Sequence, residues 1–150
     1  METATEREKR SPGSLCLFRL GARRFALHLD AIGEVVESGD ITPLPGAPDF
    51  LMGLANIRGE IIPVIDITPF VGGERVVPAF ENPLLILRDE EGRVGVVAHR
   101  VIGVREMVTD AWPSDEAHYV LHEGDDGDGP VAWIDIARIL RDGRRELASL

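Results

Sequence analysis

The 150-residue chain carries a formal net charge of −10 and has a pI of about 4.8, and its length fits one domain. This acidic balance excludes the basic footprint that nucleic-acid binding needs and disfavours direct contact with an anionic membrane surface. No apolar run reaches the roughly 20 residues of a membrane span, and no apolar stretch of a signal peptide follows the charged N-terminus. With Cys16 as its only cysteine, the chain is expected to be cytoplasmic.

The two ends of the chain are expected to lie outside the globular part. Residues 1–13 are polar and charged and end in Ser-Pro-Gly, so they should form a disordered tail. Residues 14–142 should form a single domain, followed by a C-terminal tail over residues 143–150. Within the domain, residues 15–20 and 25–29 are apolar enough to form the first two strands.

A helical turn at residues 30–32 and a strand that contains Glu34 lead into a proline-rich stretch with Pro43, Pro45 and Pro48. Each proline lacks an N–H and fixes φ, so this stretch should be a stiff, extended connector and not a helix or a central strand. Residues 53–58 and 61–67 then predict a hairpin. Its turn should be Gly59-Glu60, because glycine at the first position suits a type II′ turn.

That turn pairs Arg58 with Ile61 and sorts the hairpin's side chains onto two faces. One face is wholly apolar and consists of Ala55, Ile57, Ile62 and Val64. The other face sets Arg58 and an amide among aliphatic residues, and a cation in such surroundings needs a partner. The nearest suitable carboxylate upstream is that of Glu34, so we predict a Glu34–Arg58 ion pair. The alternative is two separate, solvated charges.

The rest of the chain continues as short strands. A loop of some 15 residues follows residue 67, and strands are predicted at 84–87, 93–99, 101–108, 119–122 and 131–136, with a short closing helix at 137–140. Nine or ten strands with turn signals every 8–12 residues indicate an all-β barrel or sandwich with short helical segments.

The residue types that carry catalysis or bind metals do not form a convincing set. His118 and His122 lie four residues apart in a strand-like segment, which separates them by about 13 Å, and no third ligand is evident. The loop with Asp125, Asp126 and Asp128 lacks the glutamate that ends a calcium loop. No nucleophile–base pair or phosphate-binding glycine loop is present. We therefore expect no metal site, no cofactor and no enzymatic activity.

Glu34, the run ITPLPGAP and the block GLANIRGEIIPVIDI together resemble the signature of the CheW family, the coupling proteins of bacterial chemosensory arrays. Weaker similarity extends from about residue 15 to residue 140, nearly the whole chain. The resemblance implies two packed, five-stranded SH3-like barrels as subdomains of one domain. It also implies a stand-alone, non-enzymatic adaptor that is recruited to membrane-associated receptor arrays.

The resemblance implies two partners, the cytoplasmic tip of a chemoreceptor and the regulatory domain of the histidine kinase CheA. The positions that match the family's receptor-binding residues are Ile32, Glu34, Gly53 and Arg58. Gly53 would let a partner's backbone come close, although a turn or bulge glycine is the alternative. For the kinase, we expect an apolar contact from the exposed-looking residues of the loop 71–80, namely Val76, Val77 and Phe80.

Two alternatives to a complete adaptor remain. The first is a CheW-like binding module that has lost one of its two partners. The second is a small β-barrel that binds an anionic ligand near Arg58.

Overall fold

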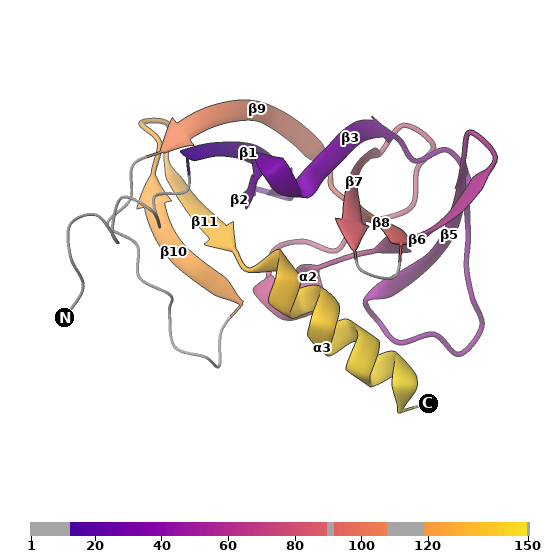
Figure 1. Ribbon diagram of the computed structural model, residues 1–150. Coiled ribbons are helices and arrows are strands. Elements are labelled where there is room, and N and C mark those ends of the chain that lie inside the picture. The colour runs from indigo at the N-terminus through magenta and orange to yellow at the C-terminus, as the bar shows by residue number, and fades with distance from the viewer. Residues whose placement is uncertain (1–12, 90–91, 108–118, 150) are drawn as a thin grey trace.

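The computed structural model describes residues 13–89, 92–107 and 119–149, and these form two β-sheets set side by side with one long helix beneath them (Figure 1). The first sheet has the strand order β10-β11-β2-β1-β9. Its strands are β10 (Val120–Asp125), β11 (Pro130–Ile134), β2 (Arg23–His28), β1 (Gly13–Leu20) and β9 (Arg100–Met107). The expected tail therefore gives way to strand at Gly13, and residues 1–12 lie outside the described residues.

The second sheet holds the middle of the chain and has the strand order β3-β7-β8-β6-β5-β4. Its strands are β3 (Ile32–Glu37), β7 (Pro83–Asp89), β8 (Gly92–Val97), β6 (Glu60–Ile65), β5 (Leu51–Ile57) and β4 (Ile41–Thr42). Strand β4 stands at the edge of the sheet and ends just before Pro43, the first proline of the connector. Because a proline has no N–H to donate to a neighbouring strand, the pairing with β5 ends there. This two-residue strand makes the second sheet six-stranded, one strand more than expected.

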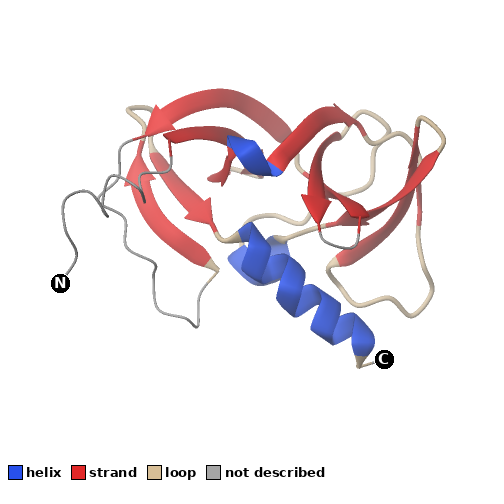
Figure 2. Ribbon diagram, in the orientation of Figure 1, coloured by secondary structure: helices blue, strands red, loops and turns tan. Residues whose placement is uncertain are grey.

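Helices are few, as Figure 2 shows. They are the 3₁₀ turn η1 (Leu29–Ala31), the short α2 (Thr68–Val71) and α3 (Ile136–Ala148). None of the helices in the described part of the chain has the length and apolar content that crossing a bilayer requires.

One hydrophobic core joins the two sheets. It includes Phe18 and Phe25 from the first sheet and Val64, Leu85 and Val96 from the second, all 0 % exposed. Because this cluster is continuous, the two sheets pack as one unit, which fixes the position of surfaces that both contribute.

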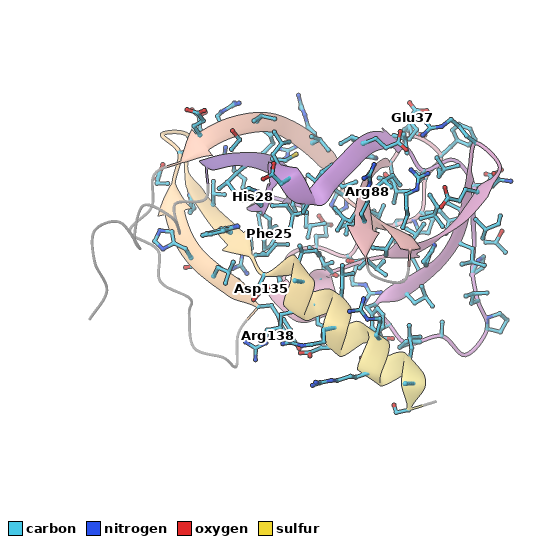
Figure 3. All side chains as sticks on the ribbon, viewed as in Figure 1. Phe25, His28, Glu37, Arg88, Asp135 and Arg138 are labelled. Carbon is cyan, nitrogen blue, oxygen red and sulfur yellow. The ribbon has the colours of Figure 1, made fainter. Side chains whose placement is uncertain are left out.

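The C-terminal helix is much longer than the predicted helix at 137–140, and the predicted tail from residue 143 is wrong up to Ala148. Asp135 caps the helix, because its Oδ1 accepts a hydrogen bond from the Arg138 N–H at 3.1 Å (Figure 3). Apolar positions at Ile136, Ile139 and Leu140 continue through Gly143 and Leu147, a helical spacing that the sequence also displays.

The hairpin between β5 and β6 turns one residue earlier than predicted. Asn56 pairs with Ile61 and Ile57 with Glu60, so Arg58 and Gly59 form the turn, with φ of 51° and 86°. Two positive φ angles define a type I′ turn, and the Asn56 carboxamide oxygen accepts the Gly59 N–H at 2.8 Å. The pairing differs from the prediction by two residues, so alternate side chains keep their faces.

The apolar face predicted for this hairpin is therefore confirmed. Ala55, Ile57, Ile62 and Val64 are all at most 6 % exposed and belong to the shared core. Arg58, by contrast, lies in the turn and not among aliphatic strand neighbours.

Candidate functional site

The predicted Glu34–Arg58 ion pair is confirmed, and it belongs to a larger network. Arg58 Nη2 donates to Glu34 Oε1. The same carboxylate oxygen accepts from Arg93 Nη1 at 3.1 Å, and Arg93 Nη2 and Nε reach Glu60 Oε2 at 2.6 Å and 3.1 Å. Two cations and two anions thus alternate in one chain of contacts across β3, the β5–β6 hairpin and β8.

The network lies at the surface. The side chains of Arg58 and Glu34 are 63 % and 28 % exposed, and those of Arg93 and Glu60 are 30 % and 50 % exposed. The hydrogen bond from Arg58 is the main cause that lowers the pKa of Glu34, and the same bond raises the pKa of Arg58. Both groups therefore stay charged across the physiological range, while water screens their attraction.

Sequence reasoning missed Arg93 and Glu60 as members of this network. They lie at the starts of β8 and β6, which are neighbours in the sheet and run parallel to each other. Parallel neighbours are joined by a long crossover, so only the sheet topology brings these two residues together, and no local spacing reveals the contact.

Ile32 and Glu34 both lie on β3, but an irregular register separates them. Ile32 pairs with Leu87 and Glu34 with Ile86, so Gly33 is inserted between them as a bulge. The inserted residue removes the shared face that alternate residues of a regular strand would have. Ile32 packs, half-buried, against the core, while Glu34 joins the network.

Gly53 is a bulge glycine that packs against its own chain. It has φ +154°, it is buried, and the register of β5 and β6 shifts beside it. A Cβ at this position would lie 2.2 Å from the carbonyl oxygen of Thr42 on β4. The backbone expected to approach Gly53 from a partner therefore comes from Thr42 of this chain, because β4 fills that space.

Of the three loop residues expected to be exposed, Val76 is not. It is 4 % exposed, whereas Val77 and Phe80 are 78 % and 61 % exposed. The cause is Asp66, a fully buried carboxylate whose Oδ2 accepts the Val76 N–H at 3.1 Å. That bond draws residue 76 into the core and leaves its neighbour Val77 outside.

Asp66 also organises the chain after β6. Its Oδ1 accepts hydrogen bonds from the N–H and the hydroxyl of Thr68, at 2.9 Å and 2.7 Å, and Arg75 Nε lies 3.3 Å from its Oδ2. The carboxylate thus fixes the start of α2 and the middle of the following loop. Asp66 was not among the residues predicted from the sequence, although a carboxylate directly after an apolar strand was a usable signal.

The exposed part of the loop is held against the end of β3. The N–H of Gly39 donates to the carbonyl of Phe80 at 2.9 Å, and the buried Ser38 hydroxyl donates to backbone carbonyls of the loop, including that of Ala79 at 3.1 Å. Val77 and Phe80 are therefore presented on a positioned backbone.

Metal ligation finds no support among the residues that the structure describes, where no group of three or more histidine, cysteine or acidic side chains gathers. His118 lies outside the described residues. Asp126 instead forms a two-bond ion pair with Arg24, at 2.7 Å and 2.5 Å, and this hydrogen bonding holds the pKa of Asp126 at about 2. Burial raises the pKa of the Cys16 thiol, as expected of a structural cysteine.

Comparison with curated proteins finds several relatives. The chain is 28 % identical over 95 residues to Protein PilI of Pseudomonas aeruginosa, 36 % over 99 residues to Protein FrzA of Myxococcus xanthus and 32 % over 87 residues to the chemotaxis protein CheW of Thermotoga maritima. The matches cover 63 %, 64 % and 58 % of this chain and 53 %, 61 % and 57 % of the respective relatives. The chain thus spans little more than half the length of these relatives.

Among solved structures, the fold is similar to the crystal structure of the scaffolding protein TtCheW from Thermoanaerobacter tengcongensis, with a TM-score of 0.70. The match is 24 % identical in sequence and covers 82 % of this chain and 84 % of that one, and it confirms the expected fold class. The family model for the CheW-like domain matches residues 14–144, nearly the whole described chain. The chain therefore belongs to the family of CheW-like domains.

Proposed function

We propose that this chain is a cytoplasmic adaptor that couples a chemoreceptor to the regulatory domain of the histidine kinase CheA in a bacterial chemosensory array. The coarser part of this statement, a CheW-like scaffold without enzymatic activity, follows from the family. The observation that supports the finer part, the coupling of a receptor to the kinase, is the network of Arg58, Glu34, Arg93 and Glu60. Its ion pairs hold these charges in fixed positions at the protein surface.

The network supports a receptor contact because it presents a cation in a defined direction. Arg58 is 63 % exposed at a hairpin tip, yet one of its nitrogens is held by Glu34. A guanidinium anchored in this way loses little conformational freedom when its other donors bind a partner's carbonyl or carboxylate. In this proposal Glu34 positions Arg58, Ile32 supplies the nearby apolar surface, and Gly53 acts through the packing of β4.

The kinase contact is assigned to Val77 and Phe80. An exposed aromatic side chain on a positioned loop is a common anchor of a protein interface, and burial of Phe80 and its neighbour Val77 against the partner removes apolar surface from water. Val76 takes no part, because it already lies in the core.

An anionic small-molecule ligand near Arg58 has less support. Glu34 and Glu60 already neutralise the two arginines of the network, so its formal charge is zero. A free anion would have to displace a carboxylate held by two arginines.

The test is titration calorimetry with two purified partners from the same genome, the CheA regulatory domain and a receptor-tip fragment. Each CheA-type kinase of that genome is used, because the relatives carry the different names PilI, FrzA and CheW. Phe80→Ala should weaken kinase binding by more than about 1 kcal/mol and leave receptor binding unchanged. Arg58→Ala should do the reverse, and Val104→Ala, at a residue 50 % exposed on β9, serves as the matched surface control.

Binding of the wild-type chain to only one partner would show a module that has lost the other. Binding to neither partner would refute the coupling function and leave the fold unaffected. Equal effects of Phe80→Ala and Val104→Ala would refute the assignment of the kinase surface.

A further inference from the structure

The exposed part of the loop, residues 77–82, is closed by hydrogen bonds of its own. The N–H of Asn82 donates to the carbonyl of Ala79 at 3.1 Å, which is the hydrogen bond of a four-residue turn. The Asn82 side chain reaches further back, because its Nδ2 donates to the carbonyl of Val77 at 2.9 Å. This half-buried residue therefore closes the turn with its backbone and joins the two ends of the segment with its side chain.

Two other anchors hold the segment from outside. At its entrance, Asp66 accepts the N–H of Val76 at 3.1 Å. At its far end, the Ser38 hydroxyl and the Gly39 N–H donate to backbone carbonyls of residues 79 and 80. The carbonyl of residue 77 lies between these two anchors, and the Asn82 side chain is the group that holds it.

The segment has little conformational freedom apart from residues 79–81. Val77 and Asn82 both precede a proline, which confines their backbone to extended conformations. The side-chain hydrogen bond of Asn82 spans the residues that remain free to rotate. It therefore fixes the direction of the Phe80 side chain relative to that of Val77.

We infer that Asn82 is a positioning residue of the kinase surface, because its side-chain amide sets the relative position of Val77 and Phe80. This inference rests on the proposed assignment of the kinase contact to these two residues. The physical reason is entropic, since a loop that is ordered before binding loses less conformational freedom when the partner binds. Asn82 acts through the other two side chains and needs no contact with the kinase.

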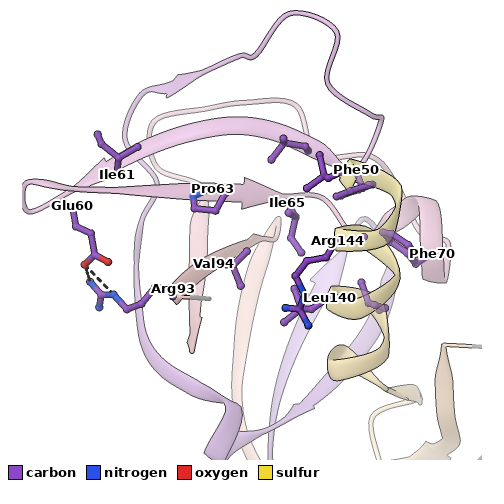
Figure 4. Close-up of a pocket in the computed structure, with 15 residues that line it drawn as sticks. Phe50, Glu60, Ile61, Pro63, Ile65, Phe70, Arg93, Val94, Leu140 and Arg144 are labelled. Atoms are coloured by element: carbon purple, nitrogen blue, oxygen red, sulfur yellow. Dashed lines mark hydrogen bonds and ion pairs between the residues drawn. The ribbon is translucent and has the colours of Figure 1, made fainter. Parts of the chain in front are cut away.

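The segment is separate from the other surface features of the chain. A groove of about 350 Å³ lies between α3 and the strands β5, β6 and β8 (Figure 4). The described residues that line it, among them Ile61, Pro63 and Leu140, include none from the segment 77–82. The ion-pair network around Glu34 contains none of them either. A substitution in the segment should therefore leave the groove and the network intact.

Replacing Asn82 with aspartate keeps the size of the side chain but replaces its N–H donor with an oxygen that repels the Val77 carbonyl. In titration calorimetry, Asn82→Asp should weaken binding of the CheA regulatory domain about fivefold and leave binding of the receptor tip unchanged. Asn82→Ala removes the donor without adding charge and should weaken kinase binding about threefold. It also replaces the aspartate variant if circular dichroism shows that variant to be misfolded.

The matched control for the added charge is Asn56→Asp, in the turn of the β5–β6 hairpin. Asn56 is exposed, and its side-chain oxygen accepts the Gly59 N–H at 2.8 Å. A carboxylate oxygen accepts this hydrogen bond equally well, so the turn is kept while the same charge is added. Kinase binding should therefore be unchanged in this variant.

A double-mutant cycle separates positioning from direct contact. If Asn82 acts by orienting Phe80, Asn82→Asp should change kinase binding by less than about 1.5-fold once Phe80→Ala is present. If Asn82 touches the kinase itself, the fivefold loss should persist in that background.

Amide hydrogen exchange of the free chain, followed by NMR, tests the loop without any partner. The Gly39 N–H donates to the Phe80 carbonyl at 2.9 Å and should exchange about fivefold faster in Asn82→Asp, because the segment opens more often. The His99 N–H donates to the Arg19 carbonyl at 3.0 Å on the other sheet and should exchange at an unchanged rate.

Three results would overturn the inference. They are an unchanged exchange rate at Gly39, kinase binding that both Asn82 variants leave intact, or a fivefold loss that persists in the Phe80→Ala background. These failures differ from failure of the proposed function. If the wild type binds no CheA regulatory domain, the coupling function is refuted. If Phe80→Ala weakens kinase binding and the Asn82 variants do not, this inference alone is refuted.

Discussion

Replacing Gly53 with alanine separates a packing role of this residue from a receptor contact. An alanine Cβ would lie 2.2 Å from the Thr42 carbonyl oxygen, and ordinary contact begins at 3.4 Å, so β4 or β5 must move by about 1.2 Å (3.4 − 2.2). The φ of +154° adds backbone strain for any residue other than glycine. Overpacking and strain each cost about 1–3 kcal/mol, so the free energy of unfolding should fall by about 2–6 kcal/mol.

The matched control lies in the same hairpin. Gly59 has φ +86°, but a Cβ there would meet nothing within 4 Å, so Gly59→Ala introduces the strain without the clash. Urea unfolding of both variants should show a larger loss for Gly53→Ala, and the difference reports the clash with β4 together with the more restricted φ of Gly53. If Gly53→Ala were as stable as the wild type but had lost receptor binding, Gly53 would be a partner contact and the packing account would be refuted.

Three further substitutions test other parts of the structure. Asp66→Ala leaves the N–H groups of Thr68 and Val76 without their acceptor and should cost about 3 kcal/mol or more in urea unfolding; a loss below about 1 kcal/mol would contradict its organising role. Asp126 has its pKa lowered from 3.8 to about 2, so Asp126→Asn should cost about 2 kcal/mol near pH 7, and this difference should disappear as pH falls from 4 to 2; a pH-independent difference would contradict the ion pair. Gly143→Leu should lower the thermal midpoint by several degrees, since the new side chain meets the Phe50 ring, whereas an unchanged midpoint would show that α3 shifts freely.

Much of the hairpin could be predicted from residue types, yet its turn could not. The alternation of Ala55 and Ile57 with polar residues specifies which face is buried, because one face must enter the core. The position of the turn depends on a smaller difference in free energy between two local conformations. A glycine at the first turn position favoured Gly59-Glu60, but Arg58 adopts a positive φ and the Asn56 side chain closes the turn over Gly59.

The helix α3 and the residue Val76 show two further limits. The apolar spacing in α3 was visible in the sequence, but Gly143 lies within it, and glycine in a helix interior costs about 1 kcal/mol. Only the position of Phe50 explains why glycine is kept there. Val76 looked exposed in a polar loop, and its burial depends on Asp66, ten residues earlier in the chain.

The sequence by itself determined the all-β class and the apolar face of the hairpin, because both follow from alternation. It also indicated the Glu34–Arg58 pair, although the aliphatic setting expected for Arg58 is absent, since this side chain is 63 % exposed in the turn. The tertiary structure alone decided the membership of Arg93 and Glu60 in the network and the groove beside α3. The physical reason is that parallel strands and a docked helix are brought together by a core shared between distant segments. Such contacts cannot be predicted from the spacing of residues along the chain.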